Sequence, residues 1–232
     1  MYGSCATHLS LPKQRIIRGW RGKGDQIEDL EMKHRVNSVP AYVCVARHGE
    51  TDWNIAGILQ GWIDVEINDK GRRQAYELVA TFAGSGFSRV YSSPLSRALE
   101  TAEIIARALR LAPPACHEGL KERNFGAIQG IPKAELADLN PVLLQQILKR
   151  NPATSFEQGE SMDDFASRVL DAIISIARPH SGERVLVIAH GWVMDVITRH
   201  VANLPRNAIL NVKRKNGECL WLEVAGQSIR PL

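Results

Sequence analysis

The sequence lacks the short motifs that usually mark a metal centre or a nucleotide-binding loop. It has no HExxH motif, no pair of histidines four residues apart, and no group of aspartates with the spacing of metal ligands. It also has no GxxxxGK(S/T) loop to hold nucleotide phosphates. We therefore expect a protein that uses no metal and that is not a nucleotide-binding α/β protein.

Long apolar runs are missing too, and cysteines are few. No stretch reaches the ~18 consecutive apolar residues of a transmembrane helix, so we expect no membrane partner. The cysteines form neither a CxxC motif nor a mixed Cys/His pattern, which is typical of reduced thiols in the cytosol. The sequence thus predicts a cytoplasmic protein. The cysteines are Cys5, Cys44, Cys116 and Cys219.

Positive charge is in slight excess, with a formal net charge of +4, and most of the excess lies in residues 1–38. The rest of the chain is nearly neutral, so we expect no nucleic-acid partner. Residues 1–38 lack the apolar segment of a secretory signal, although the basic stretch 13–23 weakly resembles a transit or membrane-surface segment. We favour a disordered N-terminal extension at 1–38, followed by a single domain at 39–232.

Strand and helix patterns alternate from residue 41 onward. Two helix starts carry a capping signal, at Ser93 before a proline and at Ser161. The alternation is typical of a three-layer α/β/α sandwich with a mostly parallel central sheet. The predicted strands are 42–46, 87–91, 115–117 and 185–189. The predicted helices are 70–83, one from Ser93, short pieces within 121–160, 163–176 and 191–201; 208–213 and 218–224 form a predicted hairpin around the turn 215–217.

Several chemically active residues directly follow predicted parallel strands. Arg47 and His48 follow the first strand, residues 92–97 the second, and His190 with Gly191 the strand at 185–189. Because ligands bind beyond the carboxyl ends of such strands, we expect these segments to meet at one edge of the sheet.

Two histidines and two arginines at this edge suit phosphoryl transfer. A neutral His48 imidazole could attack phosphorus if an acceptor holds its other ring N–H. Arg47 and Arg97 offer planar guanidinium groups that match phosphate oxygens, and Arg97 lies in the first turn of its predicted helix. His190 and the Gly191 amide could donate to the phosphoryl oxygens.

A carboxyl group and two amides complete the candidate site. Glu122, in a loop, could protonate the leaving oxygen of a phosphoester if its pKa is raised. Asn54 and Gln60 could complete the phosphate cradle, although such residues are also common in turns. Most of these residues, taken alone, are more often ordinary surface or loop residues. Their occurrence together in separate segments predicts a phosphohistidine site.

The same segments resemble the histidine phosphatase superfamily, which includes cofactor-dependent phosphoglycerate mutases. The resemblance extends from about residue 41 to about residue 225 and leaves out 1–38. Its motifs are RHGETDWN at 47–54, LQGWID at 59–64, SSPLSRA at 92–98, ETA at 100–102, ERNFG at 122–126, QG at 129–130, GES at 159–161 and AHG at 189–191.

The resemblance implies a phosphoglycerate mutase-like fold and a role for each candidate residue. His48 would be the phosphorylated nucleophile, and Glu122 would protonate the leaving oxygen and then activate the acceptor. Water as acceptor makes a phosphatase, and a second phosphoglycerate makes a mutase. Neither needs a metal, and 2,3-bisphosphoglycerate is a cofactor of the mutase alone. The residues that bind the phosphoryl group would be Arg47, Asn54, Gln60, Arg97, His190 and Gly191.

The choice between these two activities depends on the surroundings of the site. The compact stretch between Glu122 and His190 favours a phosphatase, because the mutases carry a longer insertion there, although residues 125–130 resemble the mutases. We expect a phosphomonoesterase with a small phosphorylated substrate, with a mutase as the alternative and a non-catalytic phospho-ligand-binding protein ranked third. A homodimer is expected only as the commonest oligomeric state. An apolar cover is expected from Phe125, Leu139, Leu143, Leu144 and Phe156.

Overall fold

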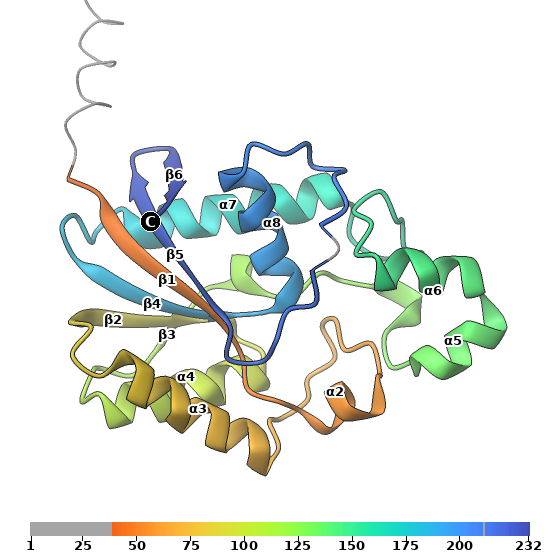
Figure 1. Ribbon diagram of the computed structural model, residues 1–232, viewed down its shortest axis with the longest axis horizontal. Helices are drawn as coiled ribbons and strands as arrows, with labels where there is room; N and C mark the ends of the chain where they lie inside the picture. Colours follow the sequence, from red (N-terminus) through yellow and green to blue (C-terminus); the bar gives the residue numbers. More distant parts are fainter. Residues whose placement is uncertain (1–38, 211) are drawn as a thin grey trace, which may run out of the picture. The chain divides into compact units, whose positions relative to one another are not determined.

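A mixed six-stranded sheet forms the centre of the fold, in the order β3-β2-β4-β1-β5-β6 (Figure 1). The computed structural model describes residues 39–210 and 212–232, so the predicted extension at 1–38 lies outside the described residues. The first four strands pair in parallel, and the last two are antiparallel. The strands are β1 (Ala41–Arg47), β2 (Phe87–Ser92), β3 (Ala115–Cys116), β4 (Arg184–Ala189), β5 (Cys219–Ala225) and β6 (Ser228–Pro231).

Helices cover both faces of the sheet, which gives the predicted α/β/α sandwich (Figure 1). The helices α3 (Asp69–Phe82) and α4 (Ser96–Ala108) pack on one face, and α7 (Met162–Ala177) and α8 (Gly191–Val201) pack on the other. The remaining helices lie beyond the carboxyl ends of β1 and β4. They are α2 (Asp52–Ala56), α5 (Lys133–Leu139) and α6 (Pro141–Leu148), with short 3₁₀ turns at Glu118–Leu120 and Gly126–Ile128.

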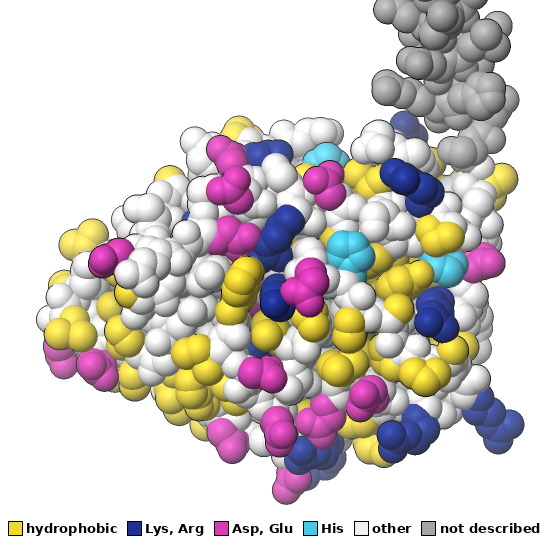
Figure 2. Space-filling view, turned by 180° about the vertical axis from the view of Figure 1, so that it is seen from behind, with side chains coloured by type: hydrophobic (Ala, Val, Ile, Leu, Met, Phe, Trp, Pro, Cys, Tyr) yellow, Lys and Arg dark blue, Asp and Glu magenta, His cyan; other side chains and the backbone are white. Residues whose placement is uncertain are grey.

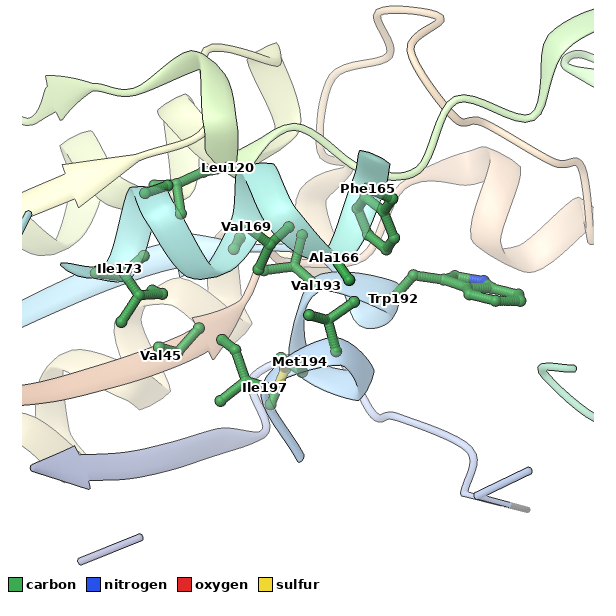
Figure 3. Close-up of a cluster of buried hydrophobic side chains, with 14 of the residues drawn as sticks. Val45, Leu120, Phe165, Ala166, Val169, Ile173, Trp192, Val193, Met194 and Ile197 are labelled. Atoms are coloured by element: carbon green, nitrogen blue, oxygen red, sulfur yellow. The ribbon is translucent and has the colours of Figure 1, made fainter. Parts of the chain in front are cut away.

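The larger core lies between the sheet and α7 with α8 (Figure 3). On α7, Phe165, Val169 and Ile173 recur at helical spacing and are fully buried. The Ser161 hydroxyl accepts from the Asp164 N–H and caps this helix, as predicted. The Asp164 carboxylate bonds the same hydroxyl, so the reciprocal half of a capping box is replaced by a side-chain contact.

Charged side chains of both signs are interspersed on the face shown in Figure 2. Within the described ranges, no helix is both long enough and apolar enough to cross a membrane.

The start of α4 differs from the prediction. Ser93 is not the N-cap, because its N–H bonds to the Ile188 carbonyl and continues the sheet. The helix begins three residues later, at Ser96. There the carboxylate of Asp64 accepts from the Ser96 N–H at 2.7 Å and from its hydroxyl at 2.6 Å. The cap therefore comes from a distant loop, which no local sequence signal could indicate.

The predicted hairpin of 208–213 with 218–224 is also wrong. β5 pairs instead with β1 on one side and with β6 on the other, and the turn lies at Gly226 with φ +57°. Residues 212–216 turn across the carboxyl-end edge and line the cavity described below. The buried Arg214 side chain holds this segment in place through a bond to Asp195 at 2.9 Å.

Candidate active site

His48 follows β1 directly and is almost fully buried, with 3% of its surface exposed. Its Nδ1 lies 2.6 Å from the carbonyl oxygen of Gly49. A carbonyl can only accept, so Nδ1 carries the proton and the Nε2 lone pair is free. Burial, followed by the charges of Arg47 and Arg97, lowers the pKa of His48 well below its ordinary value. The imidazole is thus held neutral with one nitrogen ready to act as a nucleophile.

The close packing around Gly49 explains why a glycine follows His48. A Cβ at Gly49 would lie 2.5 Å from the Gly71 carbonyl oxygen at the start of α3. Its N–H donates to the Thr101 hydroxyl of α4 at 3.0 Å. The His48 backbone is therefore fixed between β1 and two helices.

His190 ends β4 and lies beside His48, with ring centroids 5.2 Å apart. It is fully buried, and neither ring nitrogen has a partner in the described part of the chain. Burial, then the charges of Arg97, His48 and Arg47, lowers its pKa well below the ordinary value. An unpartnered buried imidazole is costly unless a ligand pairs with it.

Arg47 and Arg97 line the same cavity from β1 and α4. The Arg47 Nη1 donates to the Arg214 carbonyl at 2.6 Å, and the Arg97 Nη2 donates to the Gly61 carbonyl at 2.7 Å. The buried Nε of each has no partner among the described residues. Burial lowers the pKa of each arginine to about 10, so both remain charged at neutral pH. Each guanidinium is anchored by protein carbonyls and lines the same cavity, where its charge can attract an anion.

Glu122 reaches the site from the loop before α5, with 9% of its surface exposed. The Arg123 N–H donates to its Oε1 at 2.9 Å, and the Trp192 N–H lies 3.4 Å from its Oε2. Burial raises its pKa, and the neighbouring N–H groups with Arg150 and Arg97 reduce that rise. A buried carboxyl with a raised pKa can act as a proton donor.

The side-chain amides of Asn54 and Gln60, predicted to bind phosphate, both form hydrogen bonds with Thr51. Asn54 accepts from the Thr51 N–H at 3.2 Å and completes a capping box of α2. The Gln60 Nε2 donates to the Thr51 hydroxyl at 2.9 Å, and its buried Oε1 has no partner within the described ranges.

These residues surround a cavity of about 840 Å³ at the carboxyl-end edge of the sheet. Arg47, His48, Asn54, Gln60, Arg97 and Glu122 line it. The cavity wall does not include His190, whose ring lies beside that of His48, or Gly191, the first residue of α8. A Cβ at Gly191 would lie 3.1 Å from the Arg150 guanidinium.

Basic residues that the sequence analysis did not single out also line the cavity. Burial and repulsion from Arg150, Arg47 and Lys213 lower the pKa of Lys133, which indicates a concentrated positive field. In the sequence these residues look like ordinary solvated charges, although the consecutive basic residues at 149–150 and 213–215 could have indicated a positively charged surface. The added basic residues are Lys133, Lys149, Arg150, Lys213, Arg214 and Lys215.

The expected apolar cover is mostly wrong. Phe125 lines the cavity, but Leu139 is 67% exposed, and Leu143, Leu144 and Phe156 do not reach the wall. Leu143, Leu144 and Phe156 pack against the larger core cluster instead.

Among the described residues, no group of three or more His, Cys, Asp or Glu side chains could hold a metal ion. The positive charge that the described residues bring to the cavity comes from arginine and lysine side chains.

Comparison with known proteins identifies the family of the chain. The family model of the histidine phosphatase superfamily (branch 1) matches residues 43–231. The chain is 36% identical over 172 residues to a metal-independent phosphoserine phosphatase of Arabidopsis thaliana, covering 73% of this chain and 71% of that protein. It is 36% identical over 156 residues to the phosphoglycerate mutase-like protein 4 of the same plant, covering 66% and 68%.

A solved structure is similar over nearly its whole length. Bacillus stearothermophilus YhfR superposes with a TM-score of 0.76 at 30% identity, covering 82% of this chain and 95% of that one. Its similarity and the family match agree with the mixed sheet and its helical layers. The chain belongs to the histidine phosphatase superfamily, whose members are phosphatases or phosphoglycerate mutases.

Proposed function

We propose that this chain is a metal-independent phosphomonoesterase that works through a phosphohistidine on His48. The observation that carries the proposal is the arrangement around this imidazole. Its Nδ1 proton is held by Gly49, and Arg47 and Arg97 each keep an unpartnered Nε in the buried site. A neutral nucleophile next to two anchored cations suits attack on a phosphate ester.

In the first step the His48 Nε2 forms a bond to phosphorus while the bond from phosphorus to the ester oxygen breaks. Arg47 and Arg97 offset the charge on the equatorial oxygens of the transferring group. His190 adds a donor beneath them. The protonated Glu122 gives its proton to the departing oxygen, so that an alcohol leaves instead of an alkoxide.

In the second step water replaces the alcohol. The Glu122 carboxylate takes a proton from this water as its oxygen bonds to phosphorus and the bond from phosphorus to Nε2 breaks. Inorganic phosphate leaves, and both His48 and Glu122 return to their starting protonation states. No metal or other cofactor enters either step.

A panel of phosphomonoesters assayed for phosphate release in EDTA tests the proposal. We expect turnover by the native chain and at least a ~10³-fold loss in His48→Ala, with the exposed His200→Ala as the matched control. Rapid denaturation during turnover should trap phosphate on the native chain in an acid-labile, alkali-stable form. Release that needs a divalent metal, or that survives in His48→Ala, would contradict the proposal.

The basic cavity wall favours a second candidate, phosphoglycerate mutase activity. Lys133, Arg150 and Lys213 add positive charge beyond the two site arginines, which suits a substrate with more than one anionic group. The same residues would fit 2,3-bisphosphoglycerate. Conversion of 3-phosphoglycerate to 2-phosphoglycerate that requires this bisphosphate, together with slow phosphate release, would favour the mutase over the phosphatase.

A further inference from the structure

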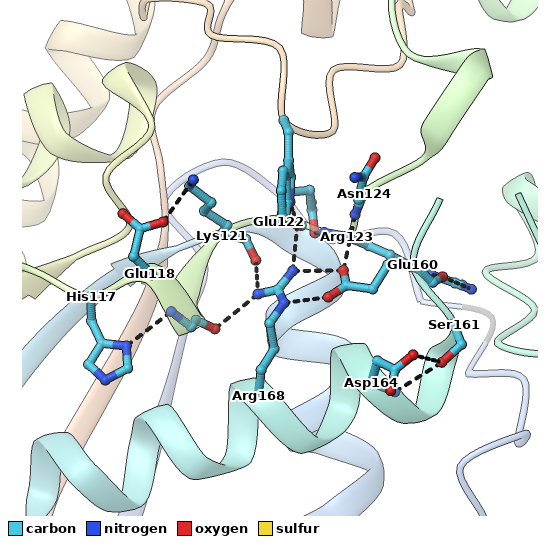
Figure 4. A network of polar contacts seen from close by, with 12 residues as sticks. His117, Glu118, Lys121, Glu122, Arg123, Asn124, Glu160, Ser161, Asp164 and Arg168 are labelled. Carbon is cyan, nitrogen blue, oxygen red and sulfur yellow. Dashed lines mark hydrogen bonds and ion pairs between the residues drawn. The ribbon is translucent and has the colours of Figure 1, made fainter. Parts of the chain in front are cut away.

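One arginine outside the cavity is bonded to the whole backbone segment that carries Glu122. Arg168 of α7 donates from Nη1 to the carbonyls of Gly119 at 3.0 Å and Lys121 at 2.8 Å (Figure 4). Its Nη2 donates to the carbonyl of Glu122 itself at 2.8 Å. Three carbonyls within four residues therefore bond to one planar group.

The remaining donors of Arg168 bond to Glu160. Nε lies 2.5 Å from Oε1 and Nη2 lies 2.8 Å from Oε2. The five N–H donors of a guanidinium are thus all used within the protein. Arg47 and Arg97 instead line the cavity, and the buried Nε of each has no partner among the described residues. Arg168 lies outside the cavity wall, and its donors support the backbone.

Glu160 extends the support to the other side of Glu122. Its Oε2 accepts from the Asn124 N–H at 3.2 Å, and its own N–H donates to the Asn124 carbonyl at 3.0 Å. Its carbonyl accepts from the Arg123 Nη2 at 3.2 Å. The peptides before and after Glu122 are therefore both fixed.

A second donor reaches the Glu122 carbonyl from another loop. The Trp62 indole Nε1 donates to it at 2.7 Å, and the Arg168 guanidinium lies 5.9 Å from the centre of the Trp62 ring. Trp62 is 40% exposed, so its indole can be altered without opening the core. The Glu122 backbone is thus bonded from α7 and from the loop after Gln60.

We propose that Arg168 is a positioning residue that fixes the Glu122 carboxyl where it meets the leaving oxygen. The inference rests on the proposed function of Glu122 as the acid. Arg168 does not line the cavity, and it contacts the Glu122 segment through the backbone of 119–122; its charge is also the smallest of the influences that lower the pKa of His190. Its rigid base is α7, whose neighbouring residues Phe165 and Val169 are fully buried.

The proposal predicts an effect that depends on the leaving group. Attack by His48 does not use the Glu122 segment, but departure of an alkoxide requires the Glu122 proton as the phosphorus–oxygen bond breaks. A p-nitrophenolate is stable enough to leave without that proton. A displaced Glu122 should therefore slow the cleavage of phosphoserine far more than the cleavage of p-nitrophenyl phosphate.

The test compares kcat/KM on these two esters, because this ratio reports the steps up to formation of the phosphohistidine. We expect Arg168→Met to lose about 10- to 100-fold on phosphoserine and less than about 3-fold on p-nitrophenyl phosphate. Arg168→Lys should recover part of the loss, because one ammonium cannot span all five acceptors. Trp62→Phe, which keeps a ring and removes one donor, should lose about 5-fold on phosphoserine.

Arg206→Met is the matched control, because it removes another ion pair of α7, between Arg206 and Asp163 at 3.0 Å, without touching the Glu122 segment. We expect it to behave as the native chain. If Arg168→Met does not fold, Trp62→Phe decides the question. Equal losses on both esters, or no loss on phosphoserine, in a folded variant overturn the proposal. Failure of the native chain to cleave either ester would instead refute the proposed function.

Discussion

Replacing the buried Asp195 with asparagine should destabilise the chain strongly. Asp195 lies on α8 with no exposed surface, and its two carboxylate oxygens each pair with a different arginine. Oδ2 is 2.6 Å from Arg150 and Oδ1 is 2.9 Å from Arg214. Asparagine has nearly the same shape, so the change alters charge and hydrogen bonding and leaves packing intact.

The magnitude follows from these two contacts. An asparagine oxygen can accept from one arginine, but its amide group then meets the other arginine donor to donor. One charge-assisted hydrogen bond, worth about 1.5–3 kcal/mol, is lost outright. Arg150 and Arg214, with only 16% and 5% of their side chains exposed, also lose the charge of Asp195, and Arg214 keeps Glu218 as its remaining carboxylate partner. Breaking a buried pair costs about 3–5 kcal/mol, so we expect a loss of at least about 3 kcal/mol.

Urea unfolding followed by circular dichroism measures this loss. Asp163→Asn is the matched control, since Asp163 pairs with Arg206 but is 80% exposed. Such surface pairs contribute about 0–1 kcal/mol, so the control should unfold nearly as the native chain does. A free energy of unfolding for Asp195→Asn within about 1 kcal/mol of the native value would refute the reasoning.

Two more predictions concern pH and packing. Burial raises the pKa of Glu122 above its ordinary 4.5 and lowers that of His48 well below 6.5, so the acid stays protonated to higher pH and the nucleophile stays neutral to lower pH. The pH profile of kcat/KM on phosphoserine should therefore fall at alkaline pH through the Glu122 pKa, and an unchanged alkaline limb in Glu122→Gln would contradict this role. Phe165→Ala should lower the free energy of unfolding by about 3–5 kcal/mol, because Phe165 is fully buried. In the same urea titration the control Tyr76→Ala, at a residue that is 61% exposed, should change this free energy by less than about 0.5 kcal/mol. A loss below about 1 kcal/mol for Phe165→Ala would show that the core cluster collapses around the gap.

Most of the site geometry was predictable because its residues follow strands. His48 follows β1, His190 follows β4 and Arg97 opens α4, so the rule for parallel sheets places them at one edge. Glu122 could not be placed by the same rule, because it lies in an irregular loop. Its carboxylate accepts from the N–H groups of Arg123 and Trp192, and no local pattern links Trp192 to it.

The failures share one cause, which is that long-range contacts override local signals. Ser93 has a side chain suited to capping, but its N–H donates to the Ile188 carbonyl of the sheet, and Asp64 caps the helix instead. Residues 212–216 have strand-like neighbours, but Arg214 pairs with the buried Asp195 and draws the segment over the cavity. The basic cavity wall was missed for the same reason.

The sheet order has a consequence for how the chain folds. β1 is the first strand described, yet both of its neighbours, β4 and β5, come from Arg184–Ala225 near the other end of the described sequence. Both edges of the apolar β1 therefore stay unpaired until β4 and β5 have been synthesised, which is most of the chain later. Such late, long-range pairing is slow and leaves a strand open to aggregation. His48, which β1 carries, can gain its geometry only in the last stage of folding.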